Sequence, residues 1–283
     1  MLTLPSSDYD VVGSIVAYKT DPREIDLAVR QFLAVPLRTH LFIIDNSPAP
    51  LPLTAYDAER VTYHFAGGNL GYGRAHNLAI RAAQGKSAYS LIMNTDIEYA
   101  PHVVTRLRDL LEARPTAALV CPKVLYRDGS LQHVCRLLPT PANMFLRRFL
   151  PNAAITKQAD SRYELRWWKH DKIAALPYFQ GSFMMMRTAV CNGIGGFDER
   201  FFLYGEDIDL SRRLYSIAET LYVPDVSIVH DYRRYSNSSL RGTWYGIQNN
   251  CRYFNKWGWF FDAERSAINR RVVAELTHPS SRI

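Results

Sequence analysis

The stretch Leu41-Phe42-Ile43-Ile44-Asp45-Asn46-Ser47 is a run of four large apolar residues that stops at a carboxylate. A short apolar run closed by turn-forming polar residues is typical of a strand buried in a parallel sheet. Asp45 then lies at the carboxyl edge of that sheet, where open α/β folds bind their ligands. Its position allows two roles. Asp45 could contact the base or ribose of a nucleotide, or it could form an Asx-turn that caps the strand exit. This fragment alone favours the turn.

The first half of the chain repeats this pattern on both sides of that stretch. Apolar runs alternate with helical segments, which is the order of a largely parallel sheet covered by helices. We expect strands at Val11–Tyr18, Leu41–Asp45, Val61–Phe65, Leu91–Met93 and Ala118–Cys121, and helices from Asp21-Pro22 to about Ala34, from Gly73 to Ala83 and from Pro101 to about Arg114. The sequence therefore predicts an α/β fold.

The second half of the chain is less regular. Between Tyr126 and about Leu176 the periodicity weakens, and we expect a long irregular excursion, a usual place for functional residues. Regular structure returns with a strand at Gly181–Arg187, a helix at Asp207–Ser216, a strand pair at Leu221–Val229 broken at Pro224, and a helix at about Leu240–Trp257.

Composition sets limits on the class of protein. The chain has 283 residues, 47% of them hydrophobic, and a formal net charge of +7, which suits partners that carry phosphate. The four cysteines are widely separated, without the spacing of a zinc site or a disulfide framework. Because the start has no basic and apolar leader, and no apolar run approaches about 18 residues, we expect a cytoplasmic protein.

A glycine-rich segment, residues 67–77 (Gly-Gly-Asn-Leu-Gly-Tyr-Gly-Arg-Ala-His-Asn), runs directly into a predicted helix. Such a loop can bring backbone N–H groups and a helix N-terminus to a phosphate, and Arg74 adds further donors. Its glycine spacing fits neither the Walker loop nor the dinucleotide fingerprint. A purely structural turn is an equal alternative for this segment on its own.

One further carboxylate and one histidine follow strand ends. Asp96 follows the apolar run Leu91–Met93 and could hold a hard cation through oxygen ligands, or simply form a turn. His230 ends another predicted strand and could add a nitrogen ligand to the same cation, although a lone histidine is more often structural.

Three carboxylates in four residues open the helix that follows Gly205, at Glu206, Asp207 and Asp209. Acidic residues in a first helical turn are favoured by the helix dipole, which accounts for one or two of them. Crowded carboxylates repel one another, and the repulsion raises the pKa of at least one. That carboxylate becomes a better proton acceptor near neutral pH.

Taken together, these segments resemble the family 2 glycosyltransferases of the GT-A fold, over roughly residues 9–257. The order and spacing of the motifs carry the resemblance: Asp45 to Ser47, Asn69 to Asn77, Asn94 to Asp96, Gly181-Ser182, Gly196-Phe197-Asp198, Glu206-Asp207 and His230. The segment Asn94 to Asp96 corresponds to the D-x-D-like metal motif of this family. Its first position is Asn94 where the family usually has Asp, so a weakly held metal is expected.

The resemblance implies a role for each of these positions. Asp207 would be the catalytic base of an inverting transfer, and Asp96 and His230 would ligate a divalent cation, Mg²⁺ or Mn²⁺. The nucleotide would contact Ala17, Tyr18, Asp45, Asn69, Gly71, Arg74, Asn77, Asn94 and Thr95, and the sugars would contact Gln180, Gly181, Ser182 and Glu206. The catalytic domain would span residues 8–235, with a nucleotide-binding half to about 125 and an acceptor-binding half from 126, followed by a helical extension at 236–283.

Within the family, the runs around Gln180, Asp207 and His230 look most like bacterial rhamnosyltransferases that use dTDP-L-rhamnose to build O-antigen, capsule or another cell-surface polysaccharide. A galactofuranosyltransferase using UDP-galactofuranose is the alternative. Related enzymes act on lipid-linked acceptors. Basic and aromatic residues mix at 145–149, 232–236 and 252–261, which suggests peripheral contact with the inner membrane, with ordinary aromatic packing as the equal alternative.

Other classes of protein fit less well. A nucleic-acid binder would explain the basic charge, but the recognition signatures of such proteins are missing, so no nucleic-acid partner is expected. A sugar-phosphate nucleotidyltransferase would carry a glycine-rich loop after the first strand, where this chain has Tyr18-Lys19-Thr20-Asp21. A noncatalytic protein that senses a sugar nucleotide is a further alternative. A measurement of turnover would separate it from an enzyme.

Overall fold

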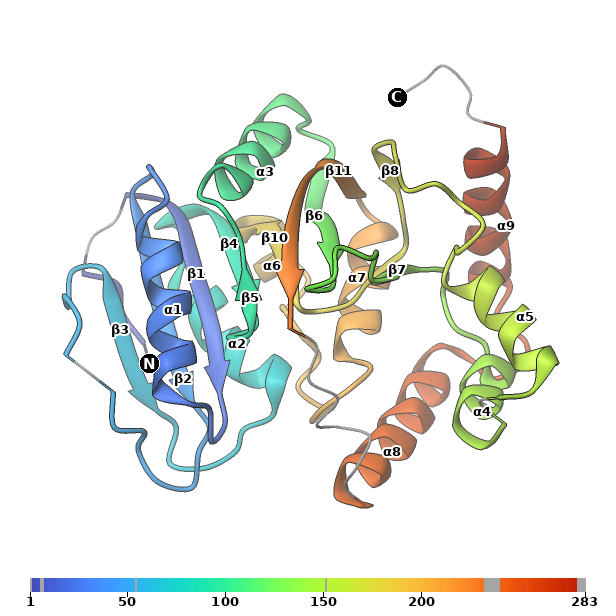
Figure 1. The fold of residues 1–283 in the computed structure, drawn as a ribbon, viewed down its shortest axis with the longest axis horizontal. Coiled ribbons are helices and arrows are strands. Elements are labelled where there is room, and N and C mark those ends of the chain that lie inside the picture. Colours follow the sequence, from blue (N-terminus) through green and yellow to red (C-terminus); the bar gives the residue numbers. More distant parts are fainter. Residues whose placement is uncertain (1, 6–7, 54, 151, 232–239, 279–283) are drawn as a thin grey trace.

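The computed structural model describes residues 2–5, 8–53, 55–150, 152–231 and 240–278 (Figure 1). The strands are β1 (Tyr9–Ala17), β2 (Thr39–Asp45), β3 (Val61–Phe65), β4 (Ser87–Met93), β5 (Ile97–Glu98), β6 (Ala117–Leu125), β7 (Cys135–Arg136), β8 (Ala174–Ala175), β9 (Tyr178–Phe179), β10 (Phe183–Arg187) and β11 (Glu219–His230). The helices are α1 (Pro22–Leu33), α2 (Tyr72–Ala82), α3 (His102–Ala113), α4 (Pro141–Phe149), α5 (Ala154–Tyr163), α6 (Thr188–Gly193), α7 (Glu206–Tyr215), α8 (Leu240–Trp257) and α9 (Ala263–Thr277).

The main sheet has the strand order β3-β2-β1-β4-β10-β6-β11-β5, with β8 added beside β11. Strands β1 to β4 are parallel, β10 runs antiparallel between β4 and β6, and β6 and β11 are parallel to each other. Helices pack on both faces, so the strands read as apolar runs rather than alternating ones. The predicted α/β fold with a mostly parallel sheet is confirmed.

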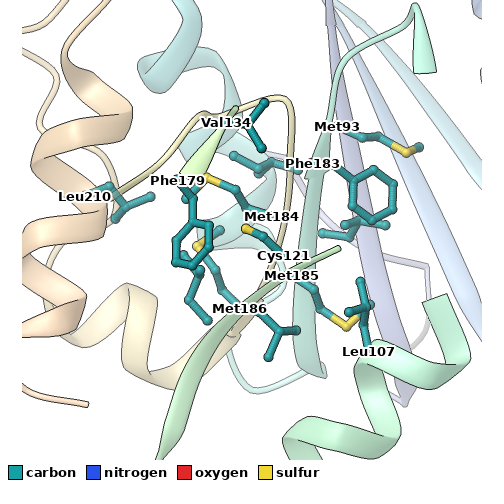
Figure 2. Close-up of a cluster of buried hydrophobic side chains, with 14 of the residues drawn as sticks. Met93, Leu107, Cys121, Val134, Phe179, Phe183, Met184, Met185, Met186 and Leu210 are labelled. Atoms are coloured by element: carbon teal, nitrogen blue, oxygen red, sulfur yellow. The ribbon is translucent and has the colours of Figure 1, made fainter. Parts of the chain in front are cut away.

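The centre of the core is the antiparallel strand β10. Its residues Phe183, Met184, Met185 and Met186 are all at most 1% exposed, because helices cover the sheet on both faces at this point. Figure 2 shows Leu107 of α3 and Leu210 of α7 on opposite sides of this cluster. A strand buried on both faces fixes the position of the turn that precedes it.

The second half of the chain is more regular than its sequence suggests. The excursion predicted as irregular contains α4 and α5, and a small second sheet in which β7 pairs antiparallel with β9. Helix α4 begins with a capping box: the Thr140 hydroxyl accepts from the Asn143 backbone N–H at 3.1 Å, and the Asn143 side chain accepts from the Thr140 N–H at 3.2 Å.

One other expectation needs correction. The strand pair predicted to break at Pro224 is one strand, β11, whose register with β6 shifts between Val223 and Ser227. Proline has no N–H to donate, and a bulge at that place removes the need for one. A further helix, α9, follows α8. Among the described residues, no helix combines the length and the apolar character needed to cross a membrane.

Candidate active site

The topology brings the polar ends of several strands to one edge of the main sheet. Ala17 and Asp45 are register partners at the ends of β1 and β2, and Met93 ends β4 in the same direction. Because β10 is antiparallel to β4, its first residues lie at this edge too, with Phe183 paired to Met93. His230 ends β11 on the same side. The edge therefore gathers side chains from both halves of the chain.

Asp45 is fully buried and organises the loop that follows β2. Its Oδ1 accepts from the Ser47 N–H at 2.8 Å, which is an Asx-turn, and its Oδ2 accepts from the Leu51 N–H at 2.9 Å and from the Tyr63 hydroxyl at 2.6 Å. Burial raises the pKa of Asp45, but the hydrogen bonds from Ser47, Tyr63 and Leu51 outweigh burial and hold it below its ordinary value. The structural alternative for this residue is the one that the contacts support.

The loops after β1 and β2 are joined through backbone atoms. The Asn46 N–H donates to the Ala17 carbonyl at 2.8 Å, and the Lys19 N–H donates to the Ser47 hydroxyl at 2.8 Å. Tyr18 lies between these two contacts and exposes half of its side-chain surface. Of the nucleotide contacts expected here, Tyr18 is the side chain with the most surface for a ring to stack on.

The glycine-rich loop is held by the side-chain amides of Asn69 and Asn46 and by the close approach of Gly71 to the backbone of Phe202. Asn69 Oδ1 accepts from the Gly71 N–H at 2.9 Å, and Asn46 Nδ2 donates to the Gly71 carbonyl at 3.1 Å. Gly71 has φ of +86°, and a Cβ there would lie 2.4 Å from the carbonyl oxygen of Phe202. Only glycine fits this turn, which delivers the first residues of α2 to the shared edge.

Helix α2 carries two residues expected at the nucleotide, and they face different environments. Arg74 is exposed in the first turn, with Nε 3.5 Å from Glu199 Oε2. Asn77 is 1% exposed and clamps the Gly-Phe-Asp segment: Nδ2 donates to the Phe197 carbonyl at 2.9 Å, and Oδ1 accepts from the Phe197 N–H at 2.8 Å. Burial leaves Asn77 no surface for a direct nucleotide contact, so we assign it to the positioning of α2.

Asp96 and His230 lie together although 134 positions separate them in the chain. His230 Nε2 is 3.3 Å from Asp96 Oδ1 and 3.4 Å from Asn94 Nδ2. Gln132 fixes the ring from behind, since its Nε2 donates to the His230 carbonyl at 2.7 Å and its Oε1 accepts from His230 Nδ1 at 3.2 Å. This arrangement places the Nδ1 proton on the Gln132 side and directs Nε2 toward Asp96.

The donor set of this pair suits a divalent cation. A carboxylate oxygen and an imidazole nitrogen are ligands for Mn²⁺ and Mg²⁺, and a nucleotide diphosphate supplies further oxygens. Within the part of the chain that the structure describes, no group of three or more His, Cys, Asp or Glu side chains gathers to hold a metal. Asp96 and His230 stay the candidate protein ligands, and the weak binding expected from Asn94 stays a prediction.

Glu206 and Asp207 begin α7 at the same edge. Glu206 is 4% exposed and its Oε2 has no hydrogen-bond partner; burial and the charge of Asp207 raise its pKa well above the ordinary value. Burial also raises the pKa of Asp207, while the N–H groups of Gly181 and Ile208 and the charge of Arg136 limit the rise. A part-exposed carboxylate with a raised pKa is suited to accept a proton near neutral pH.

The segment Gln180-Gly181-Ser182 lies directly against Asp207. The Gly181 N–H donates to Asp207 Oδ2 at 3.2 Å, and a Cβ on Gly181 would lie 3.2 Å from the Asp207 Cβ. The Ser182 hydroxyl is buried and has no partner. Together with Glu206 Oε2, it gives this side of the site two buried polar atoms without partners, which is unusual outside binding sites.

A model of the family described as Glycosyl transferase family 2 matches residues 11–164, which is more than half of the chain. The match covers the strands and loops that carry Asp45, the glycine-rich segment and Asp96. The chain belongs to glycosyl transferase family 2. The resemblance on which the site residues were predicted is confirmed.

Relatives of this family 2 member include two proteins named as rhamnosyltransferases. The N-acetylglucosaminyl-diphospho-decaprenol L-rhamnosyltransferase of Mycobacterium tuberculosis is 29% identical over 180 residues, which is 58% of this chain and 56% of that protein. Rhamnosyltransferase WbbL of Escherichia coli is 28% identical over 188 residues, 62% of this chain and 66% of that protein. The chain spans about half the length of the mycobacterial relative.

The fold also has solved counterparts. The structure of GalNAc-T7 with UDP, GalNAc and Mn²⁺ aligns over 91% of this chain and 50% of that one, with a TM-score of 0.62 and 14% sequence identity. At this identity the likeness shows the fold alone, and the GT-A fold expected for this family 2 member is confirmed.

Sequence reasoning missed four side chains that the structure brings to the site. The Tyr72 hydroxyl is 2.9 Å from Asn94 Oδ1 and also contacts the Gly181 carbonyl, so it links the metal side to the base side. Gln132 holds the ring of His230, as described above. Arg136 and Tyr178 lie behind Asp207. Tyr72 stands inside the quoted glycine-rich motif and could have been found, whereas Arg136 and Tyr178 are placed by the long-range pairing of β7 with β9.

Two residues predicted to contact the nucleotide have hydrogen-bond partners within the protein. The Asn94 N–H donates to the Ser182 carbonyl at 2.9 Å, so this loop is tied to the start of β10. The Thr95 hydroxyl donates to Glu24 of α1. Both residues lie at the shared edge, and their contacts with a nucleotide stay predictions.

Proposed function

We propose that this protein is an inverting glycosyltransferase that moves L-rhamnose from dTDP-L-rhamnose to a hydroxyl of a lipid-linked glycan. One observation carries the proposal: a part-exposed carboxylate of raised pKa, Asp207, lies at the same sheet edge as the Asp96–His230 pair. Tyr72 connects the two through its contacts with Asn94 and Gly181. A proton acceptor beside a diphosphate-binding edge is the arrangement that a single displacement at a sugar carbon requires.

Asp207 is the proton acceptor in this proposal. The acceptor hydroxyl gives its proton to the Asp207 carboxylate while its oxygen forms a bond to the anomeric carbon of the donor. The bond from that carbon to the nucleotide diphosphate breaks on the opposite face, so the configuration inverts. The N–H of Gly181 holds Oδ2 of Asp207 at 3.2 Å and thereby fixes the orientation of the base.

Asp96 and His230 would hold a divalent cation, which supplies charge neutralisation to the departing diphosphate. Gln132 supports this role because it orients the imidazole and leaves Nε2 on the side of Asp96. Arg74, exposed at the start of α2, adds a positive charge near the N-terminus of that helix. Both features favour a phosphate-bearing ligand at this edge.

The names of the relatives support the choice of donor and acceptor. The mycobacterial relative is named for L-rhamnose transfer and for a diphospho-decaprenol acceptor, and WbbL is named a rhamnosyltransferase. Peripheral contact with a membrane would bring a lipid-linked acceptor to the site. Exposed rings support such contact: Phe145 and Phe149 on α4, and Phe260 and Phe261 between α8 and α9. The candidate tail at 232–236 lies outside the described residues.

Transfer assays with the purified protein test the proposal. dTDP-L-rhamnose, UDP-galactofuranose and UDP-GlcNAc are compared as donors with and without Mn²⁺, using a synthetic GlcNAc-diphospho-lipid acceptor. We expect metal-dependent transfer from dTDP-L-rhamnose with inversion. Transfer from UDP-galactofuranose alone would identify the alternative donor, and the absence of nucleotide binding under any condition would refute the proposal.

A further inference from the structure

An ion network with a buried centre lies behind Asp207, and the proposed transfer reaction makes no use of it. Its centre is Glu164, whose side chain is 4% exposed. Glu164 accepts from Arg147 Nη1 at 2.7 Å and from Arg166 Nη2 at 2.6 Å, and Arg136 Nη2 is 3.5 Å away. Burial raises the pKa of Glu164, but the charges of Arg136 and Arg147 outweigh burial and hold it below its ordinary value.

Arg136 connects this network to Asp207 through one tyrosine. Arg136 and Tyr178 are cross-strand partners in the small sheet formed by β7 and β9. Arg136 Nη1 is 3.5 Å from the Tyr178 hydroxyl, and that hydroxyl is 3.5 Å from Asp207 Oδ2. A guanidinium can only donate and a carboxylate only accept, so the tyrosine must accept from Arg136 and donate to Asp207.

The balance of charge points the same way. The network contains three guanidinium groups, Arg136, Arg147 and Arg166, and two carboxylates, Glu164 and Asp160, which Arg147 also contacts at 3.3 Å. One positive charge is left without a carboxylate in the network. The rings of Tyr163 and Tyr178 flank Arg136 at 5.9 and 5.8 Å from its guanidinium carbon, which limits where that charge can point.

We propose that Arg136 is a positioning residue for Asp207, which acts through Tyr178 to orient the carboxylate and favour its charged form. This inference rests on the proposed function, in which Asp207 is the base. The other groups that face Asp207 are the acid Glu206 on α7, the neutral hydroxyls of Tyr72 and Tyr163, and the Gly181 N–H. Burial opposes the charged form of Asp207, and Arg136 is the cation that counters it.

A direct titration tests the inference without turnover. The Asp207 carboxyl is titrated by ¹³C NMR in the wild-type protein and in its Arg136→Met and Arg136→Lys variants. We expect the Asp207 pKa to rise in Arg136→Met and to stay near the wild-type value in Arg136→Lys, which keeps the charge. In the same variants kcat/KM at acidic pH should fall about tenfold for Arg136→Met, with the donor KM unchanged.

Two tyrosine variants control for a purely structural role. Tyr178→Phe removes the hydroxyl between Arg136 and Asp207 and should shift the Asp207 titration in the same direction by a smaller amount. Tyr163→Phe keeps a ring against Arg136 and should leave the titration unchanged. Tyr178→Phe also tests the inference if Arg136→Met fails to fold.

The outcomes separate the two proposals. An unchanged Asp207 titration in folded Arg136→Met or Tyr178→Phe protein overturns the inference, whether or not the wild-type protein transfers sugar. The expected shift in a protein without transferase activity supports the Arg136–Tyr178 link and refutes the proposed function.

Discussion

Asp45 and Asp207 are carboxylates at the same edge of one sheet, and they are held in opposite ways. The oxygens of Asp45 accept hydrogen bonds from Ser47, Leu51 and Tyr63, and its pKa is lowered. Asp207 is part exposed, lies beside the acid Glu206, and has a raised pKa. Position at the sheet edge therefore does not decide the role of a carboxylate. The closeness of its donors does: they lie 2.6–2.9 Å from the oxygens of Asp45 and 2.9–3.5 Å from those of Asp207. Short hydrogen bonds stabilise the charged form, whereas burial disfavours it.

The same contrast extends to the two halves of the site. On the side of β1 to β3, loops are closed by hydrogen bonds among themselves, as in the Asn69 and Asn46 contacts with Gly71. Asn46 Oδ1 is the buried atom of these loops that has no partner, whereas on the side of β9 and α7 both the Ser182 hydroxyl and Glu206 Oε2 are buried without partners. The first side is held mainly by its own hydrogen bonds, and the second has more bonding capacity left for a ligand.

The largest test of this contrast is Asp207→Asn. If Asp207 is the proton acceptor, transfer should fall about 10²–10⁴-fold while nucleotide affinity is retained. Initial rates and calorimetric nucleotide titration measure the two quantities. Asp225→Asn, at the surface beside Arg106, is the matched control and should keep full activity. Wild-type rates in Asp207→Asn would show that Asp207 is not the catalytic base.

The second test concerns the pair that would hold the cation. Asp96→Asn removes the carboxylate and keeps the shape, so we expect the Mn²⁺ concentration for half-maximal activity to rise about 10–100-fold. Gln132→Leu, which loses only the support of His230, should give a smaller rise. Activity that survives EDTA unchanged in the wild-type protein would contradict the assignment of both ligands.

A third test compares the stability of the two carboxylate sites. Asp45→Asn should lower the free energy of unfolding by about 1–2 kcal/mol at pH 7, because buried donors lose a charged acceptor. The folded pKa of Asp45 is lowered, so its stabilisation is present above the unfolded pKa and is lost as pH falls through the folded pKa. The pKa of Asp207 is raised, so its contribution is present below the unfolded pKa and is lost as pH rises through the folded pKa.

Urea denaturation of both Asn variants between pH 3 and pH 8 measures this difference. For each variant, the difference in free energy of unfolding from the wild type is plotted against pH. This difference should change with pH in opposite directions for Asp45→Asn and Asp207→Asn. Parallel curves would show that the environments of Asp45 and Asp207 are alike and would undo the comparison.

The smallest effect is expected at the surface of the C-terminal helices. Phe260→Ser with Phe261→Ser removes two exposed rings and should weaken binding to vesicles of anionic lipid several-fold, with activity on a soluble acceptor unchanged. Vesicle co-sedimentation measures the loss. Ile217→Ser, another exposed apolar residue located after α7, is the control. Equal binding by the double variant and the wild type would place the membrane contact elsewhere or exclude it.

Local signals made most of the first half of the chain predictable. The apolar runs of β1 to β4 and β6, and the start of α1 at Asp21-Pro22, were predicted within a few residues. Apart from the edge strand β3, these strands are largely buried on both faces, so their composition is distinctive. The family resemblance rested on polar residues that follow them, and the structure brings Asp96 and His230 together as expected.

The second half resisted prediction for physical reasons. Strands β7 and β9 have two residues each, and their pairing depends on segments about 40 residues apart, which no local pattern records. The placement of Arg136 beside Asp207 follows from that pairing. Helix α4 is short, but its Thr140-Pro141 start was a readable signal, since threonine at the N-cap and proline at the next position favour a helix.

The position of β11 has a consequence for how the site forms during synthesis. It is the last strand of the main sheet in the chain, yet it lies between β6 and β5, and its final residue is His230. A chain that has emerged only as far as β10 can complete the parallel region from β1 to β4 but has neither the partner of Asp96 nor the strand that pairs with β5. The loops after β1 and β2 can thus order first, and the site would be completed only when β11 docks.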